Sequence, residues 1–229
     1  MKPYTWLLLD ADDTLFDFGK AESKSLYATI EEQGLSFPAD PAPVYTQINL
    51  QIWKELELGQ ISSSALRAER FARLFRHFGV STDVETFSRR YLANLALGSD
   101  LLPGAAELLT ALSGRYRLGL VTNGLPEVQR PRLERAGIAH YFAFAAISEE
   151  IHASKPDPRF FQAALALAGS PDPAAVLVIG DSLTSDIRGG CQAGLDTLWF
   201  NPANLPPDPR WPPTYQAASL LEIQQLMGR

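Results

Sequence analysis

Cysteine is nearly absent from the sequence, whose 229 residues include only Cys191. A single cysteine excludes a disulfide framework within the chain and fits a reducing compartment. Basic residues are in the minority, with 20 lysines and arginines against 26 acidic residues and a formal net charge of −6. This balance offers no electrostatic footprint for a nucleic-acid polymer or an anionic membrane surface. A chain of this charge that handles an anionic substrate would need to gather cations locally.

Long apolar runs are missing as well. The run Trp6–Leu9, preceded by Lys2, imitates a signal peptide, but it stops after four residues and no small-residue cleavage site follows. No run approaches the roughly 20 residues that a membrane-spanning helix needs. We therefore expect a cytoplasmic protein without a membrane partner. The three histidines show no metal-ligand spacing, so packing or surface positions are the default for each.

The chain divides into two parts by its hydrophobic pattern. Residues 19–97 show helical periodicity without a convincing strand, as in the apolar series Phe71, Leu74, Phe75 and Phe78. Aromatic stripes of this kind are far more often packed core than a ligand-binding face. We expect residues 19–97 to form a helical domain inserted into a core domain made of residues 1–18 and 98–229.

In the second part, short apolar runs alternate with helical patterns, which predicts an α/β fold with a Rossmann-like open parallel sheet. The predicted strands cover residues 4–9, 117–121, 141–147, 175–179 and 197–200. The predicted helices cover residues 105–112, 126–136, 158–168, 186–193 and 220–227. Residues 201–214 contain six prolines and predict an irregular strap over the surface.

Polar residues follow several of the predicted strands directly. The first strand ends in three acids, Asp10, Asp12 and Asp13, although carboxylates near a core are costly unless they are paired or bind a metal. Thr122 follows the second strand and Asp181 a later one. Ligands of open α/β sheets bind at the carboxyl ends of the strands, so these residues predict one shared site.

The spacing of these residues resembles a known family. Asp10–Thr14 reads DADDT, Thr122 follows the second strand, and Lys155 precedes the segment GDSLTSD that ends at Asp186. Together they resemble the phosphatases of the haloacid dehalogenase superfamily. The resemblance covers the whole chain and implies that residues 19–97 are the small helical cap of that family. More narrowly, the segments DADDTLF, LVTNG, ISEE, KPDPRFF and GDSLTSDI are similar to the 5′-nucleotidases that act on pyrimidine nucleotides.

The resemblance implies a catalytic role for the acids of the first strand. Asp10 would attack phosphorus and form an aspartyl-phosphate. Asp12 would protonate the leaving oxygen and then activate water, which requires a protonated Asp12 when substrate binds. We expect the crowded acids to favour that form. Thr14 would shape the following turn, and Asp13 would be a solvated neighbour.

The resemblance also implies how the phosphate and a metal are held. Lys155, the hydroxyl of Thr122 and the backbone N–H groups of Asn123 and Gly124 would bind the phosphoryl oxygens. Mg²⁺ would bind the carboxylates of Asp10 and Asp181 together with the backbone carbonyl of Asp12.

Two kinds of residue around this predicted site carry weaker predictions. Asp186 would hold Lys155 or a metal-bound water from outside the set of direct metal ligands. Asn49, Trp53 and Arg70 are candidates for substrate contacts from the cap, although Trp53 suits helix packing equally well.

One position departs from the nucleotidase pattern. His152 stands shortly before Lys155, where a glycine is common, and a bulkier residue there puts the geometry of the Lys155 loop in question.

The leading interpretation is a Mg²⁺-dependent phosphomonoester hydrolase acting on a small phosphorylated metabolite, a pyrimidine nucleoside monophosphate. A phosphoglycolate or sugar-phosphate phosphatase and a phosphomutase would use the same residues. A 2-haloacid dehalogenase shares the fold but has no need of an acid/base carboxylate at Asp12. A non-catalytic binding protein on the same fold is a further alternative, which the complete set of catalytic residue types disfavours.

Overall fold

The computed structural model describes residues 2–228, which form two compact units. One unit is Met1–Phe18 with Ser99–Arg229, and the other is Gly19–Gly98. These boundaries lie within one residue of those expected from the hydrophobic pattern. The first unit is called the sheet unit below, and the second the helical unit.

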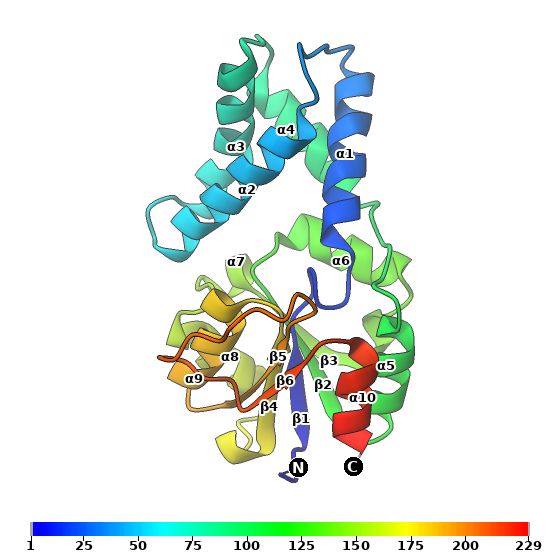
Figure 1. Cartoon of the computed structure of the whole chain (residues 1–229), viewed down its shortest axis with the longest axis vertical. Coiled ribbons are helices and arrows are strands. Elements are labelled where there is room, and N and C mark those ends of the chain that lie inside the picture. The colour runs from blue at the N-terminus through cyan, green and yellow to red at the C-terminus, as the bar shows by residue number, and fades with distance from the viewer. Residues whose placement is uncertain (1, 229) are drawn as a thin grey trace. The chain divides into compact units, whose positions relative to one another are not determined.

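The sheet unit is built on six parallel strands in the order β3-β2-β1-β4-β5-β6, which confirms the Rossmann-like open sheet (Figure 1). The strands are β1 Trp6–Leu9, β2 Arg117–Thr122, β3 Phe142–Ile147, β4 Val176–Gly180, β5 Asp196–Phe200 and β6 Tyr215–Ala217. The central strand β1 pairs with β2 on one side and β4 on the other. The sequence did not predict β6, a three-residue strand directly after the proline-rich segment, which pairs with β5.

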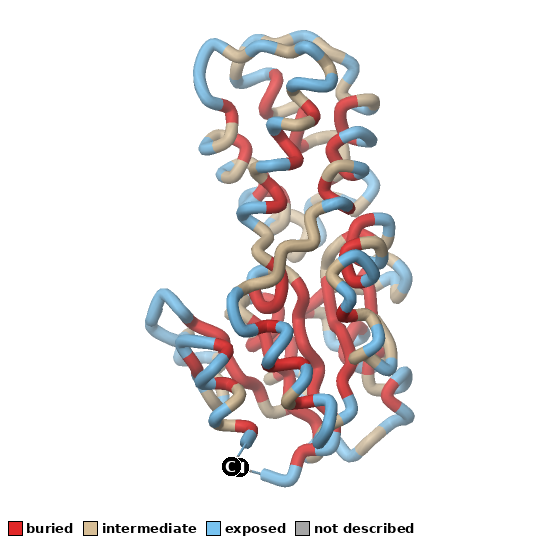
Figure 2. Tube along the Cα trace, turned by 90° about the vertical axis from the view of Figure 1, so that its right-hand side faces the viewer, coloured by how far each residue is buried: buried red, intermediate tan, exposed pale blue. Residues whose placement is uncertain are grey.

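Helices cover both faces of this sheet. They are α5 Ala105–Ser113, α6 Pro126–Arg135, α7 Ser148–Ile151, α8 Pro158–Leu167, α9 Arg188–Gln192 and α10 Leu220–Gly228. Figure 1 shows α5 and α10 together on one side of the sheet and α8 and α9 on the other. Successive side chains of β1 point to opposite faces of the sheet, which explains both layers. Leu7 and Leu9 pack with α5 and α10, whereas Trp6 and Leu8 pack with α8. The central strands β1 and β4 are accordingly buried throughout, within the buried core of the sheet unit seen in Figure 2.

The helical unit contains α1 Phe18–Glu32, α2 Ala42–Glu57, α3 Ser63–Phe78 and α4 Val84–Leu95. Its interior is aromatic, since the ring of Phe71 lies 5.3 Å from that of Tyr45 and 4.9 Å from that of Tyr91. The interpretation of the aromatic stripe as packed core is therefore correct for Phe71 and Phe75, which are buried. Among residues 2–228, no helix combines the length and the apolar character required to cross a bilayer.

Candidate active site

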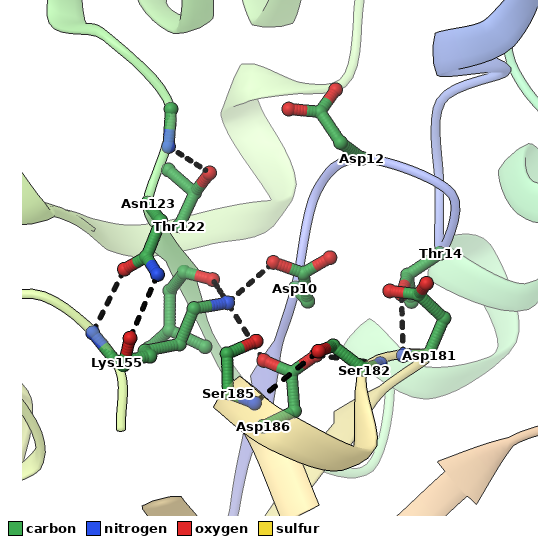
Figure 3. Close-up of polar contacts among 12 residues, drawn as sticks. Asp10, Asp12, Thr14, Thr122, Asn123, Lys155, Asp181, Ser182, Ser185 and Asp186 are labelled. Carbon is green, nitrogen blue, oxygen red and sulfur yellow. Dashed lines mark hydrogen bonds and ion pairs between the residues drawn. The ribbon is translucent and has the colours of Figure 1, made fainter. Parts of the chain in front are cut away.

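The parallel sheet brings the predicted strand-end residues to one edge. Asp10 follows β1, Thr122 ends β2 and Asp181 follows β4. Strands β2 and β4 are the neighbours of β1 in the sheet. The amide of Asp10 still donates to the carbonyl of Ile179 at 2.9 Å, so its backbone is held in the sheet. Figure 3 shows the side chains of Asp10, Asp181, Asp186 and Lys155 converging there. The spacing of these residues in the sequence therefore predicted a real spatial cluster.

Lys155 is the cation at the centre of this cluster. Its ammonium donates to Asp10 Oδ1 at 2.5 Å, to Asp186 Oδ1 at 2.7 Å and to the carbonyl of Val121 at 2.9 Å (Figure 3). All three ammonium protons are therefore engaged, and the residue is only 1% exposed. The predicted link from Asp186 to Lys155 is present.

The side chain of Asn123 has a role that the sequence did not predict. Its Nδ2 donates to the backbone carbonyl of Lys155 at 2.9 Å, and its Oδ1 accepts from the backbone N–H of Lys155 at 2.8 Å. These two hydrogen bonds from one side chain to the backbone of Lys155 hold the Lys155 loop against the end of β2. Asn123 was predicted to contribute only its backbone N–H to phosphate binding.

His152 shows why the Lys155 loop keeps its geometry without a glycine. The residue ends α7 in the left-handed region, with a φ of 59°. That region is the one glycine adopts freely, and histidine is among the residues that tolerate it better than most. The loop still delivers Lys155 to Asp10, so the departure at His152 leaves the predicted contact intact.

Burial perturbs the ionisation of the cluster. It raises the pKa of Asp10 to about 7, against the lowering effect of the Lys155 charge. Burial, reinforced by the charges of Asp10 and Asp186, also raises the pKa of Asp181 well above its usual range. Burial alone would lower the pKa of Lys155, but the Asp10 and Asp186 carboxylates raise it above its ordinary value. The buried ammonium therefore stays charged, while the carboxylates exceed the positive charge available to them.

This surplus of carboxylates fits a divalent cation. Asp10, Asp181 and Asp186 each offer an oxygen within 4.8 Å of the others. Both oxygens of Asp186 are already engaged, Oδ1 by Lys155 and Oδ2 by the amide of Ser182 at 3.1 Å. Asp186 is therefore less free to bind an ion directly, and direct binding by Asp10 and Asp181 stays a prediction. Oxygen ligands of this charge suit a hard ion such as Mg²⁺.

Thr14 has a more specific contact than the turn-shaping role predicted for it. Its hydroxyl accepts from the amide of Asp181 at 3.1 Å and lies 3.4 Å from Asp181 Oδ1 (Figure 3). The threonine of the first motif thus orients the acid that follows β4, 167 positions later in the chain.

The environment of Asp12 corrects the prediction that crowded acids surround it. Figure 3 shows its side chain directed away from Asp10 and Asp181. Its Oδ1 accepts from Arg132 at 2.5 Å and its Oδ2 from Gln129 at 2.6 Å, both on α6. The reason is geometric: the chain leaves the sheet after Asp10, so Asp12 no longer shares the environment of the strand end. Neither Gln129 nor Arg132 was predicted from the sequence.

The phosphate-binding prediction also needs a correction at Gly124. Its backbone N–H was expected to face the phosphoryl oxygens, but it donates to the hydroxyl of Thr122 at 3.0 Å. The short loop after β2 folds back on the side chain of Thr122, which leaves the Thr122 hydroxyl, the backbone N–H of Asn123 and Lys155 as the predicted phosphate ligands.

The substrate candidates of the helical unit are placed differently from one another. Asn49 and Arg70 are 2% and 1% exposed, and their side chains are hydrogen-bonded to each other at 3.4 Å. They serve the interior of the unit rather than its surface. Trp53 is half-buried on α2, and its contact with a substrate stays a prediction.

Comparison with known proteins assigns the class. The model of the haloacid dehalogenase-like hydrolases matches residues 4–194, so the chain belongs to this family. The resemblance read from the motifs is therefore confirmed, as is the expectation that the protein is an enzyme, a hydrolase.

Individual relatives sharpen this assignment. The pyrimidine 5′-nucleotidase PynA of Streptococcus pneumoniae is 38% identical over 99% of this chain and 96% of its own length. The pyrimidine 5′-nucleotidase YjjG of Escherichia coli is 34% identical over 98% of each. The crystal structure of YfnB from Bacillus subtilis, bound to magnesium, is 33% identical with a TM-score of 0.93 and covers both chains completely. These relatives support phosphatase chemistry.

Proposed function

We propose that this protein is a Mg²⁺-dependent phosphomonoester hydrolase that works through an aspartyl-phosphate and prefers pyrimidine nucleoside 5′-monophosphates. The observation that carries the proposal is the buried Asp10, bonded to Lys155 and placed beside Asp181 at the carboxyl edge of the sheet. The single cysteine and the acidic balance favour a cytoplasmic setting.

In the first step, a carboxylate oxygen of Asp10 attacks phosphorus while the bond from phosphorus to the ester oxygen breaks. The leaving alkoxide takes a proton from Asp12 and departs as the alcohol. In the second step, water attacks the aspartyl-phosphate and gives its proton to Asp12, which restores both acids and releases phosphate. Lys155 remains charged throughout and balances the negative charge around Asp10.

Two further groups support this chemistry. The hydroxyl of Thr122 donates to a phosphoryl oxygen as charge develops on it. Asp10 and Asp181 would hold a bound Mg²⁺, which neutralises the repulsion between the phosphate and the acids and polarises the phosphoryl group.

The nucleotide preference comes from the relatives named as pyrimidine 5′-nucleotidases, which align over nearly the whole chain. Trp53 remains our candidate for a contact with the base. A sugar-phosphate phosphatase or phosphomutase would use the same core residues. A dehalogenase needs no acid/base carboxylate at Asp12, so it would not require the residues that hold Asp12 in place.

The test is phosphate release by the purified protein with Mg²⁺ across a substrate panel, with Asp10→Asn as the control. The panel holds uridine, deoxyuridine and thymidine monophosphates, purine monophosphates, phosphoglycolate and sugar phosphates. We expect preference for the pyrimidine monophosphates and loss of at least about a thousandfold in kcat for Asp10→Asn, since its nucleophile is gone. Preference for another ester would overturn the nucleotide assignment, and undiminished release by Asp10→Asn would overturn the mechanism.

A further inference from the structure

Helix α6 places two polar side chains in the interior beside the site. Gln129 is 1% exposed and Arg132 is fully buried, three positions later on the same face of the helix. Burying an amide and a guanidinium is costly unless their hydrogen bonds are made in place. Their partners therefore indicate what these residues are for.

The amide of Gln129 joins two groups of the proposed mechanism. Its Nε2 donates to Asp12 Oδ2 at 2.6 Å and to the hydroxyl oxygen of Thr122 at 3.1 Å. Its carbonyl oxygen accepts from Arg132 at 3.2 Å. This pattern uses both amide protons and fixes the orientation of the amide, because the flipped form would set oxygen against oxygen.

The bond to Thr122 determines where the threonine proton points. The hydroxyl oxygen accepts from Gly124 N–H at 3.0 Å as well as from Gln129. A hydroxyl has two acceptor lone pairs and one proton, so both lone pairs are occupied. The proton is left to donate elsewhere, which is what a phosphoryl oxygen requires.

Gly124 provides a separate sign that Gln129 is built into the loop. A Cβ atom on Gly124 would lie 2.2 Å from Gln129 Nε2 and 2.8 Å from its Cδ. Only a residue without a side chain leaves room for the amide to reach Thr122. The glycine of the segment TNG therefore allows the side chain of Gln129 to occupy its position.

Arg132 contacts Asp12, the proposed acid and base of the mechanism. Its Nη1 donates to Asp12 Oδ1 at 2.5 Å, and its guanidinium lies 4.3 Å from the ring centre of Phe16. Together, the ring of Phe16 and the carboxylate of Asp12 fix the orientation of the guanidinium.

We propose that Gln129 and Arg132 are positioning residues for phosphoryl transfer. Gln129 orients both the Thr122 proton that meets the phosphoryl oxygen and the Asp12 carboxyl that serves the leaving oxygen, whereas Arg132 orients Asp12 only. The inference rests on the proposed function. It adds that Gln129 acts at both the phosphoryl group and the leaving oxygen, whereas Arg132 acts at the leaving oxygen.

The experiment compares two esters with Mg²⁺: uridine 5′-monophosphate, whose alkoxide needs a proton on leaving, and p-nitrophenyl phosphate, whose leaving group does not. Rapid mixing isolates the first step, since Asp12 activates water in the second step with either ester. For Arg132→Met we expect the first step with the nucleotide to slow about a hundredfold, within the range of general acid catalysis, and the first step with the aryl ester to change little. For Gln129→Met both esters should slow by about tenfold or more, because Thr122 serves both. KM should change much less than kcat in each case.

Three further variants control for folding. Arg135→Met changes an exposed arginine of the same helix and should leave both esters unaffected. Arg132→Lys should restore part of the nucleotide rate. Gly124→Ala displaces Gln129 without altering its chemistry and should reproduce the effect of Gln129→Met, which keeps the test available where that variant folds poorly.

The outcomes separate the two proposals. The positioning of Asp12 by Arg132 is overturned if the wild-type protein releases phosphate and the first step of the Arg132→Met variant slows equally with both esters or with neither. Gln129→Met and Gly124→Ala proteins with wild-type rates overturn the orientation of Thr122. Absence of release from both esters by the wild-type protein overturns the proposed function and this inference together.

Discussion

Both units of the molecule bury charged side chains, but they balance them differently. The sheet unit gathers Asp10, Asp181 and Asp186 around one buried ammonium, that of Lys155. The helical unit buries one acid, Glu22, and one base, Arg70. The buried cluster of the sheet unit has a surplus of negative charge, whereas the two buried charges of the helical unit balance each other.

In the helical unit, neutral groups hydrogen-bond the buried acid and aromatic rings flank the buried base. Glu22 accepts from the amide of Asn49 at 2.7 Å and from the hydroxyl of Thr46 at 2.8 Å. The guanidinium of Arg70 lies 5.0 Å from the ring centres of both Phe71 and Tyr91. These contacts link all four helices of the unit through their interior, and the charges cancel within the unit.

The comparison teaches that a buried charge or a shifted pKa does not by itself mark a reactive site. Burial raises the pKa of Glu22 as it raises that of Asp10, yet only Asp10 belongs to a cluster that its own neighbours leave uncompensated. What distinguishes the sheet unit is the charge left for a ligand to neutralise. Four variants or conditions separate the two cases.

The largest effect is expected for Lys155→Met. It removes the ammonium that is bonded to both Asp10 and Asp186, and breaking a buried ion pair from one side costs about 3–5 kcal/mol of unfolding free energy. Turnover should be lost as well. Urea denaturation of the metal-free protein measures the first effect. Adding Asp186→Asn to this variant should recover part of the stability without the activity, and a Lys155→Met protein as stable as wild type would contradict the comparison.

The next effect is that of metal and pH on the sheet unit. Because Asp10 and Asp181 have raised pKa values in the folded state, the metal-free protein should lose stability as pH rises from about 4, the unfolded value, towards 7. Mg²⁺ at a hundred times its Kd should add about 2.7 kcal/mol at neutral pH and less in acid, where protons compete for the carboxylates. Thermal melts with Mg²⁺ and with EDTA at several pH values measure this, and a Mg²⁺ effect that grows towards acid would refute it.

Glu22→Gln should have a smaller effect, confined to the helical unit. One of the two hydrogen bonds to its carboxylate is lost, at about 1 kcal/mol. The raised pKa of Glu22 means that its ionisation opposes folding as pH rises, so the neutral variant should lack this part of the pH dependence. The stabilisation by Mg²⁺ should equal that of wild type in parallel melts. A changed Mg²⁺ response would show that the two networks are not independent.

The smallest effect is expected for Arg210→Ala at the surface. Arg210 pairs with Asp208 at 2.7 Å, and its side chain is 79% exposed. Water screens such a pair and the chain pays entropy to hold it, so the melting midpoint should not change measurably. A clear loss of stability would mean that exposed pairs matter here as much as buried ones.

Much of the sheet unit was predictable because its signals are local. Buried strands read as short apolar runs, and the parallel order brings their ends together, so Asp10, Thr122 and Asp181 were placed correctly from spacing alone. The strand β6 was missed because three residues beside a proline-rich segment carry too little pattern. The role of Asn123 was missed because a side chain that binds backbone leaves no spacing signal.

The sequence by itself determined the α/β architecture, the inserted helical segment and the acids at the strand ends, because chain periodicity and parallel topology specify them. Tertiary structure alone decided that Asp12 faces Gln129 and Arg132 rather than the other acids. Those partners lie 117 and 120 positions away along the chain. The only local trace of Gln129 and Arg132 is their i, i+3 spacing on a buried helix face, and which group such a face meets depends on how α6 packs against the loop after β1.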